Sequence, residues 1–334
     1  NRNVVVVLSA GAPVTMPWLD QVKGVLHTYL GGQAGASATL DLLYGKVNPS
    51  GKLAESYPLR LEDCLSSEYF SYSRDQTEYR ESIFVGYRYY DAARKEVLFP
   101  FGYGLSYTQF SYGELELSAT EQLDSDSLTV RCKVTNTGDV AGAEIVQLYV
   151  GRDSSRIYRA PRELKGFKKV YLEPGETQTV EFVLTPRSFA YYNMEIRDWH
   201  VEPGEYQISV GASSRDLPLV ASIKINAVQQ DVEVPDYRSL APVYYHLDRG
   251  DIKISQEDFQ TVYGRPFPKS HDALPRFHGN STLEDLQVTL LGRLVLRFAK
   301  RYLWKMTGAT DEDDPLWIMT WTSTREMPLR SMVA

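Results

Sequence analysis

Two different hydrophobic periods divide this 334-residue chain. Near its start, Val4–Leu8 reads VVVVL, a continuous β-branched run typical of a strand that is buried on both faces of a parallel sheet. Between residues 113 and 228, apolar and polar residues alternate in short runs that are separated by Gly, Asn and Pro turns. Such alternation is typical of strands that bury only one face. The chain is therefore predicted to be α/β first and all-β afterwards.

Residues 1–112 are predicted to be the C-terminal part of an α/β-sandwich domain, ending in an aromatic-rich connection over residues 61–112. A second strand is expected at Gly24–Leu30. The helix expected after it would end at Gly45, since glycine favours the position just past a helix. One face of that helix would carry three apolar side chains: Leu40, Leu43 and Tyr44.

Residues 113–228 are predicted to form a β-sandwich of fibronectin type III-like or immunoglobulin-like type. The supporting pattern is a series of short strands with turn residues between them over roughly 116 positions. Most of the charged positions in these strands are read as solvated sheet surface.

Residues 229–334 are predicted to be a linker followed by a helical extension. Residues 229–278 are rich in Pro and Tyr and have no clear period, whereas an amphipathic helix is expected at about residues 281–306, with Ser281 and Glu284 as a capping box. The apolar face of this helix, here called the apolar stripe, is expected to dock on another domain, and a membrane surface is the alternative. Its apolar residues are Leu283, Leu286, Leu290, Leu294 and Phe298, and the polar face carries Arg293, Arg297, Lys300, Arg301 and Lys305.

Composition and motifs exclude several functions. The net charge of −7 argues against nucleic acid as a partner, because phosphate binding needs a basic face. There is no P-loop, GxGxxG or GxSxG motif, and the two cysteines and five histidines lack metal-ligand spacing, so no cofactor and no metal is expected. No run of about 18 apolar residues occurs, and a membrane is not expected as a partner. Because the chain starts without Met, directly before an apolar strand, it is expected to be a fragment, and its compartment stays open.

Three long segments resemble a known family. NVVVVLSAGAPVTMPWLDQVKGVLHTYLGGQAGASATLDLLYGKVNPSGKL (residues 3–53) resembles the second, α/β-sandwich domain of glycoside hydrolase family 3, the β-glucosidase family. YRESIFVGYRYYDAARKEVLFPFGYGLSYTQF (residues 79–110) is similar to that family's Y-x-E-x-I-F-V-G-Y-R-Y-Y and F-P-F-G-Y-G-L-S-Y-T motifs. VTNTGDVAGAEIVQLYVGRD, RELKGFKKVYLEPGE and VEPGEYQISVGASS, all within residues 134–214, resemble its fibronectin type III-like domain. The resemblance covers about residues 1–228.

The resemblance implies the C-terminal portion of a retaining β-glycosidase, best matched by a β-glucosidase that hydrolyses terminal non-reducing β-D-glucosyl residues of small glucosides. Such enzymes use two carboxylates about 5 Å apart. In the family the nucleophile is an Asp on a (β/α)₈-type barrel domain, and the acid/base is a Glu in a loop that precedes the segment matching NVVVVL. Both are expected outside this chain, which would then be inactive alone. The implied partners are a β-glucoside or oligosaccharide substrate and the missing barrel domain of the same protein; a homo-oligomer stays open.

Two residues are candidates for proximity to substrate. Gln33 is expected at the C-terminal edge of a strand, where ligands collect in α/β sheets. Glu81 lies in the Y-x-E motif, and its alternative role is a salt bridge or hydrogen bond, with Arg80 or Arg88 as partner, that holds the connection in place. Three tyrosines of the same motif are expected to pack rather than to stack on a sugar: Tyr87, Tyr89 and Tyr90.

Two other functions stay open. The first is a non-catalytic carbohydrate-binding or scaffold module, which would show a row of exposed Trp or Tyr on one sheet face; Trp199 is the only tryptophan between residues 113 and 228. The second is β-xylosidase-type specificity within the same family.

Overall fold

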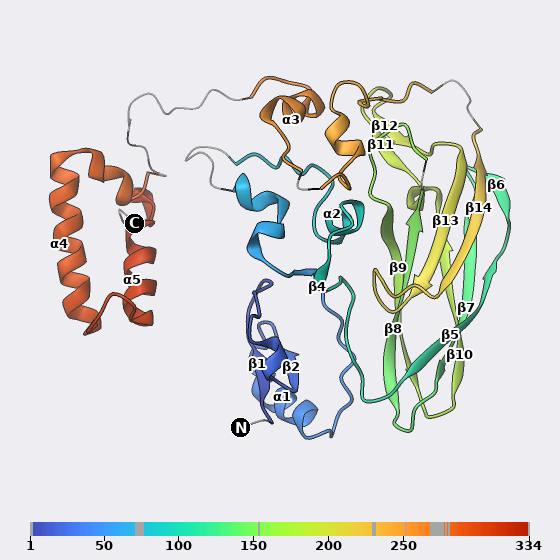
Figure 1. The fold of residues 1–334 in the computed structure, drawn as a ribbon, viewed down its shortest axis with the longest axis horizontal. Coiled ribbons are helices and arrows are strands. Elements are labelled where there is room, and N and C mark those ends of the chain that lie inside the picture. Colours follow the sequence, from blue (N-terminus) through green and yellow to red (C-terminus); the bar gives the residue numbers. More distant parts are fainter. Residues whose placement is uncertain are drawn as a thin grey trace. The chain divides into compact units, whose positions relative to one another are not determined.

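The computed structural model describes residues 3–70, 77–152, 154–228, 232–250, 252–267, 277, 279 and 281–332. The chain divides into two compact units. The first contains residues 1–70 and 78–266, and the second contains residues 71–77 and 267–334. Figure 1 shows the sandwich strands of the first unit and the helices of the second.

The first unit begins with a parallel strand pair and a helix. β1 (Val5–Leu8) pairs with β2 (Gly24–His27), and α1 (Gly35–Leu43) follows (Figure 1). Gly45 has a φ of 68°, the left-handed conformation that glycine adopts at low cost after a helix. The predicted order of strand, strand and helix is confirmed.

β1 and α1 expose more apolar surface than the sequence predicts. Val5 and Val7 are 51% and 43% exposed, so the prediction that this strand is buried on both faces is wrong for this structure. Leu40 and Leu43 of α1 are also exposed. Among the residues that the structure describes, only β2 pairs with β1, so the other edge of β1 has no strand beside it.

The aromatic-rich connection over residues 61–112 contains short helices and a strand. It contains α2 (Tyr87–Ala92), and β4 (Val97–Phe99) pairs with β3 (Tyr57–Pro58). Short 3-10 turns lie at Leu61–Asp63 and Leu65–Glu68. The buried residues of the connection form one apolar cluster with residues that follow the sandwich in the chain. Its members are Leu65, Tyr69, Phe84, Tyr89, Tyr90, Ala93, Ala241, Tyr244, Leu247 and Ile254.

Residues 110–226 form the β-sandwich, and its fibronectin type III-like architecture is confirmed. One sheet has the strand order β6-β14-β13-β8-β9 and the other has the order β10-β7-β5. A separate hairpin is formed by β11 and β12. The bounds are β5 Phe110–Leu117, β6 Glu121–Leu123, β7 Leu128–Asn136, β8 Gly142–Gly151, β9 Arg162–Leu172, β10 Thr177–Leu184, β11 Tyr191–Asn193, β12 Asp198–His200, β13 Gly204–Gly211 and β14 Leu219–Asn226.

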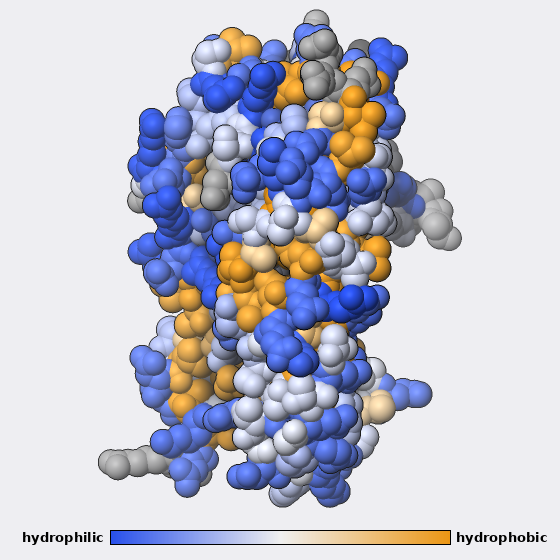
Figure 2. Space-filling model, turned by 90° about the vertical axis from the view of Figure 1, so that its right-hand side faces the viewer, coloured by the Kyte–Doolittle hydropathy of each residue, from blue (hydrophilic) through white to orange (hydrophobic). Residues whose placement is uncertain are grey.

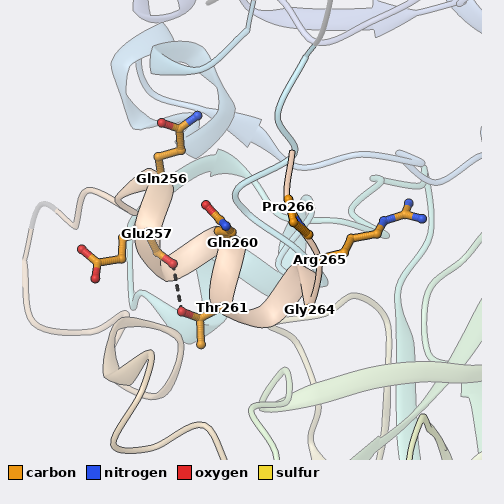
Figure 3. A pocket seen from close by; sticks show the side chains of 7 residues that line it. All are labelled: Gln256, Glu257, Gln260, Thr261, Gly264, Arg265 and Pro266. Carbon is orange, nitrogen blue, oxygen red and sulfur yellow. Dashed lines mark hydrogen bonds between the residues drawn. The ribbon is translucent and has the colours of Figure 1, made fainter. Parts of the chain in front are cut away.

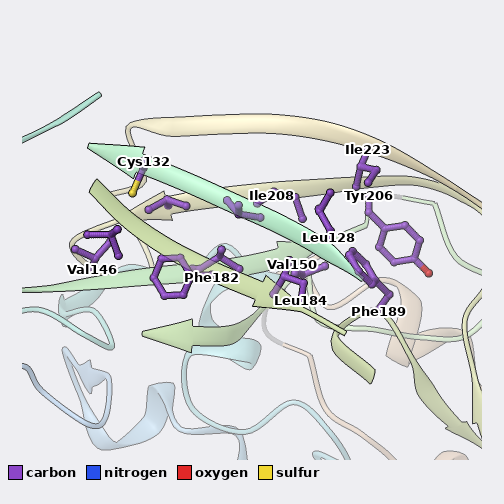
Figure 4. Close-up of a cluster of buried hydrophobic side chains, with 14 of the residues drawn as sticks. Leu128, Cys132, Val146, Val150, Phe182, Leu184, Phe189, Tyr206, Ile208 and Ile223 are labelled. Atoms are coloured by element: carbon purple, nitrogen blue, oxygen red, sulfur yellow. The ribbon is translucent and has the colours of Figure 1, made fainter. Parts of the chain in front are cut away.

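The core of the sandwich lies between its two sheets. Alternate residues of β7 are completely buried, as expected for a strand with one inward face. Figure 4 shows side chains of β7, β8, β10 and β13 filling this space, with Phe189 and Tyr206 at one end. The outer surface is mostly hydrophilic with scattered apolar patches on the side where β6 and β14 lie (Figure 2).

Polar side chains join the sandwich to the α/β segment. Lys52 forms an ion pair with Glu144 of β8. The side-chain amide of Gln147 donates to the carbonyls of Gly102 and Ala212. These bonds attach the sandwich to the residues that precede it in the chain.

Residues 232–250 and 252–266 continue the first unit with regular structure where the sequence suggests a linker. A 3-10 turn lies at Pro242–Tyr245, and α3 spans Gln256–Tyr263. α3 begins with a capping box between Ser255 and Asp258. The S-x-x-D pattern at its start was the available signal, but the short apolar stripe behind it was missed.

The second unit contains a helical pair. α4 (Leu290–Thr307) and α5 (Pro315–Arg325) contact each other through Trp304 and Trp317, whose ring centroids are 4.8 Å apart. 3-10 turns lie at Glu284–Val288 and Leu329–Met332.

The predicted start of the amphipathic helix at residue 281 is wrong. Thr289 is extended, and its hydroxyl accepts a hydrogen bond from Gly292 N–H, so α4 begins after it. The capping box predicted at Ser281 and Glu284 is also wrong, because reciprocal bonds of that kind join Thr282 and Asp285 instead.

The predicted apolar stripe is divided. Leu283 is buried, whereas Leu290, Leu294 and Phe298 are 78%, 60% and 75% exposed, so docking of the stripe stays a prediction. None of the helices in the described part of the chain is both long and apolar enough to cross a membrane.

Candidate functional site

The loop that carries Gln33 follows β2, at the C-terminal edge of the parallel strand pair. Gln33 is exposed and precedes α1 by two residues. A Cβ atom at Gly31 would lie 2.9 Å from the Cα of Gly35, so the chain can turn this tightly into α1 only with glycine at position 31. Close packing is therefore sufficient reason for the glycine at position 31, and a φ of 60° favours glycine at position 32.

Polar groups at the end of β2 lack hydrogen-bond partners among the described residues. Both ring nitrogens of His27 and the hydroxyl of Tyr57 are buried without one. Burial lowers the pKa of His27 and raises the pKa of Tyr57 to about 12. Both groups are therefore uncharged at neutral pH.

Glu81 lies in a tight turn between Glu78 and α2. Its neighbour Ser82 has a φ of 52°, and Gly86, which precedes α2, has a φ of 59°. The side chain of Glu81 is 7% exposed, and its Oε2 atom has no hydrogen-bond partner in the described part of the chain. Burial without a neighbouring cation raises the pKa of this carboxyl.

The ion pairs suggested for Glu81 are wrong. Arg80 instead binds Glu78, with Nε 2.7 Å from Oε2, and Arg88 lies 3.5 Å from Glu163 of β9. The positive φ at Ser82 turns the chain so that neighbours in sequence point to different surroundings. Glu81 is therefore a buried acid that none of the described cations neutralises, which is a feature found more often at functional sites than elsewhere.

The three tyrosines that follow Glu81 are packing residues, as predicted. They are 4% to 6% exposed. The ring of Tyr87 stacks on Phe101 with centroids 4.8 Å apart, and its hydroxyl accepts a hydrogen bond from Leu164 N–H. The rings of Tyr87, Tyr89 and Tyr90 are therefore too buried to offer an open face to a sugar.

Gln33 and Glu81 occupy different environments, one exposed and one buried. No hydrogen bond or ion pair joins Gln33 and Glu81 among the described residues, and a retaining glycosidase would need a second carboxylate about 5 Å from the first. The described residues also contain no group of three His, Cys, Asp or Glu side chains that could hold a metal ion. The described residues thus do not place a second carboxylate beside Glu81 by any contact that joins it to Gln33.

Two surface hollows do not supply a carboxylate pair either. One of about 610 Å³ lies along α3, and in Figure 3 its lining residues come from this helix and from Gly264, Arg265 and Pro266, which follow it. Glu257 is the only acidic residue among those that line it. A second hollow of about 350 Å³ is lined by three arginines and by Glu202, which already accepts bonds from Ser155 and Arg156.

Comparison with protein families gives two matches. Residues 1–107 match the family model described as the glycosyl hydrolase family 3 C-terminal domain. Residues 144–214 match the model described as the fibronectin type III-like domain. Neither match extends beyond residue 214.

Several known proteins are similar over the same part of the chain. Thermostable beta-glucosidase B of Acetivibrio thermocellus is 53% identical over 225 residues, which are 67% of this chain and 30% of that protein. An exo-alpha-(1->6)-L-arabinopyranosidase of Bifidobacterium breve is 46% identical over 226 residues, again 67% of this chain and 30% of that protein. The chain thus spans less than a third of the length of these relatives.

Solved structures agree with these matches. The crystal structure of a Bifidobacterium adolescentis GH3 beta-glucosidase has a TM-score of 0.65 and 42% identity, over 73% of this chain and 37% of that chain. The beta-glucosidase of Kluyveromyces marxianus in complex with glucose has a TM-score of 0.63 and 42% identity, over 66% of this chain and 26% of that one.

Proposed function

Because the chain belongs to glycoside hydrolase family 3, as that family's C-terminal portion, we propose that it is part of a retaining β-glycosidase. The proposed substrates are small β-glucosides or oligosaccharides, from which the whole protein removes terminal non-reducing β-D-glucosyl residues. The observation that carries this proposal is the 53% identity to a thermostable beta-glucosidase over two thirds of the chain.

In this proposal the chain contributes one wall of the substrate cleft and no catalytic carboxylate. Gln33, exposed at the edge of the parallel strands, and Glu81, in the Y-x-E motif, are the proposed substrate-proximal residues. The nucleophile Asp and the acid/base Glu would come from the rest of the protein, including a barrel domain. The division of the chain at residues 112 and 228 stays a prediction.

The sugar specificity is the least constrained part of the proposal. Two relatives, with 46% and 45% identity, are exo-alpha-(1->6)-L-arabinopyranosidases, so a similar C-terminal portion occurs with another specificity. A β-xylosidase-type specificity is the further alternative. The choice rests with residues outside this chain, since neither Gln33 nor Glu81 is surrounded by a described sugar pocket.

An assay with aryl glycosides tests the proposal. The complete protein is expected to hydrolyse an aryl β-D-glucoside faster than the matching α-L-arabinopyranoside or β-D-xyloside, and the isolated 334-residue chain is expected to hydrolyse none of them. Glu81→Gln in the complete protein should not remove catalysis. A loss of more than about 10³-fold in kcat would make Glu81 a general acid or base and would contradict the assignment.

One observation supports a second function, carbohydrate binding by the sandwich. Tyr192 of β11 lies directly opposite Trp199 of β12; both are 45% exposed, and their ring centroids are 5.3 Å apart. The guanidinium of Arg187 covers one face of Trp199. Retardation of the chain in a gel that contains β-glucan, removed by Trp199→Ala, would favour this function; unchanged mobility would contradict it.

A further inference from the structure

A segment outside both family matches is buried against the Y-x-E motif. Residues 237–250 and 252–258, here called the clamp, follow the sandwich in the chain and belong to the first unit. Four of their apolar side chains are almost inaccessible to solvent: Ala241 (0%), Tyr244 (2%), Leu247 (2%) and Ile254 (1%). A loosely attached linker would leave such side chains exposed, so the clamp is an integral part of the first unit.

The clamp binds the backbone beside Glu81 directly. Tyr244 Oη donates to the carbonyl oxygen of Arg80 over 2.8 Å, and Arg80 Nη1 donates back to the carbonyl oxygen of Ile254 over 3.1 Å. The N–H of Ile254 donates to the hydroxyl of Tyr69, 2.8 Å away. The residue before Glu81 is thus held from both its backbone and its side chain.

The clamp also completes a buried ion pair. Glu78 and Arg80 are 7% and 8% exposed, and Glu78 Oε2 accepts from Arg80 Nε over 2.7 Å. Gln256 at the start of α3 donates from Nε2 to the other oxygen of Glu78, also over 2.7 Å. A buried ion pair is stable only when its remaining hydrogen-bonding atoms have partners. Here the clamp supplies Gln256 for the second oxygen of Glu78 and the carbonyl oxygen of Ile254 for Nη1 of Arg80.

Aromatic packing supports the same turn from a third side. The ring of Tyr158 stacks on that of Tyr244 with centroids 5.0 Å apart, and it lies 6.1 Å from that of Phe84. The Tyr158 hydroxyl is 3.1 Å from Ser82 Oγ. Because Ser82 has a positive φ, which costs free energy for a residue other than glycine, the turn depends on such external support.

We propose that Tyr244 and Gln256 are positioning residues, which hold residues 78–86 and thereby the buried Glu81 in place. This inference rests on the proposed function, in which these residues form part of the cleft wall. The clamp would then set the geometry of substrate binding without touching the reacting atoms. It assigns a role to a segment that neither family match includes.

Hydrogen–deuterium exchange of the chain tests the positioning directly. Tyr244→Phe and Gln256→Leu should each raise exchange at the hydrogen-bonded amides of Ser82 and Phe84 by about three- to tenfold. Tyr206→Phe is the matched control, because its hydroxyl also donates over 2.8 Å to a backbone carbonyl, that of Glu202, from a side chain that is 1% exposed. It should leave those two amides unchanged.

Kinetics of the complete protein then separate the two proposals. If the clamp positions the wall, Tyr244→Phe and Gln256→Leu should raise KM about three- to tenfold while kcat stays within about twofold. If the amides of Ser82 and Phe84 exchanged at the same rate in Tyr244→Phe, Gln256→Leu and the control, the proposed positioning role of the clamp would be overturned. Faster exchange with unchanged KM would overturn its role in substrate binding. Faster exchange in a complete protein without glycosidase activity would overturn the proposed function and leave the clamp as a positioning segment.

Discussion

Lys52 Nζ lies 3.1 Å from Glu144 Oε1, with side chains that are only 11% and 4% exposed. The same carboxylate oxygen accepts a hydrogen bond from the hydroxyl of Tyr112 over 2.9 Å, and Lys52 also donates to the carbonyl of Gly104. A charged pair thus lies between the NPSGKL turn and strand β8. Its burial makes each partner dependent on the other.

Lys52→Met is expected to destabilise the chain by about 3–5 kcal/mol, because it leaves Glu144 buried without its cation. Urea unfolding followed by fluorescence measures the free energy of unfolding. Lys46→Met is the control: Lys46 and Asp41 are 3.2 Å apart but 70% and 41% exposed, so the loss should be below about 1 kcal/mol. Equal losses would show that the buried pair is not special.

Glu81→Gln is expected to stabilise the chain at pH 7. Burial raises the folded-state pKa of Glu81, so its contribution is most favourable below the unfolded-state value and is lost as the pH rises through the folded-state value. The neutral amide avoids that loss, and the gain should disappear near pH 4. Denaturation midpoints measured between pH 4 and pH 8 show the trend.

Asp63→Asn provides a test of opposite sign. A hydrogen bond from Arg60 lowers the pKa of Asp63, so its stabilising contribution is present above the unfolded-state pKa and is lost as the pH falls through the folded-state value. Asp63→Asn should therefore destabilise the chain at pH 7, and the difference should shrink in acid. If both variants shifted stability in the same direction, the interpretation of Glu81 would be contradicted.

Gly211→Ala is expected to cost about 3 kcal/mol or more. A Cβ atom there would clash with the backbone carbonyl oxygen of Asp216, and only a shift of the strand end can relieve this clash. Gly175→Ala, where φ is 77° and the space is open, should cost about 1–2 kcal/mol. Thermal unfolding of the two variants gives the comparison, and an equal or reversed order would count against the strand-end geometry.

Thr289→Ala is expected to shorten or destabilise α4 by about 1 kcal/mol, because the Thr289 hydroxyl caps that helix. Thr289→Ser should keep the cap. Circular dichroism at increasing urea concentration follows the helix. If alanine and serine behave alike, Thr289 is not the cap.

The architecture could be predicted from the sequence because it depends on the local spacing of apolar residues along the chain. The continuous run at the start and the alternation after residue 113 correctly predicted the strands, and the resemblance correctly predicted the family. The helix start was misplaced because the S-x-x-E pattern at Ser281 is also available to other backbone geometries. Thr282 and Asp285 form the equivalent bonds one residue later.

The surroundings of Glu81 were not readable, because they depend on contacts across more than 150 residues. Arg80 and Arg88 looked like partners by proximity in sequence, but Arg80 forms its ion pair with Glu78 and Arg88 with Glu163. The clamp has no hydrophobic period that would reveal its attachment. Apart from the S-x-x-D pattern at Ser255, its density of tyrosines was the available signal, since buried tyrosines need hydroxyl partners that bind distant segments together.

Asn48 connects three separate stretches of the chain through one side chain. Its Nδ2 donates to the carbonyl of Ala141 at the edge of the sandwich, while its Oδ1 accepts from Ser106 Oγ and from Tyr107 N–H. Exchange of the sandwich between family members would break this arrangement unless the donor supplied a compatible loop at position 141. The Asn48 side chain therefore joins the two matched segments, and chimaeras built from this protein should be joined outside residues 48–141.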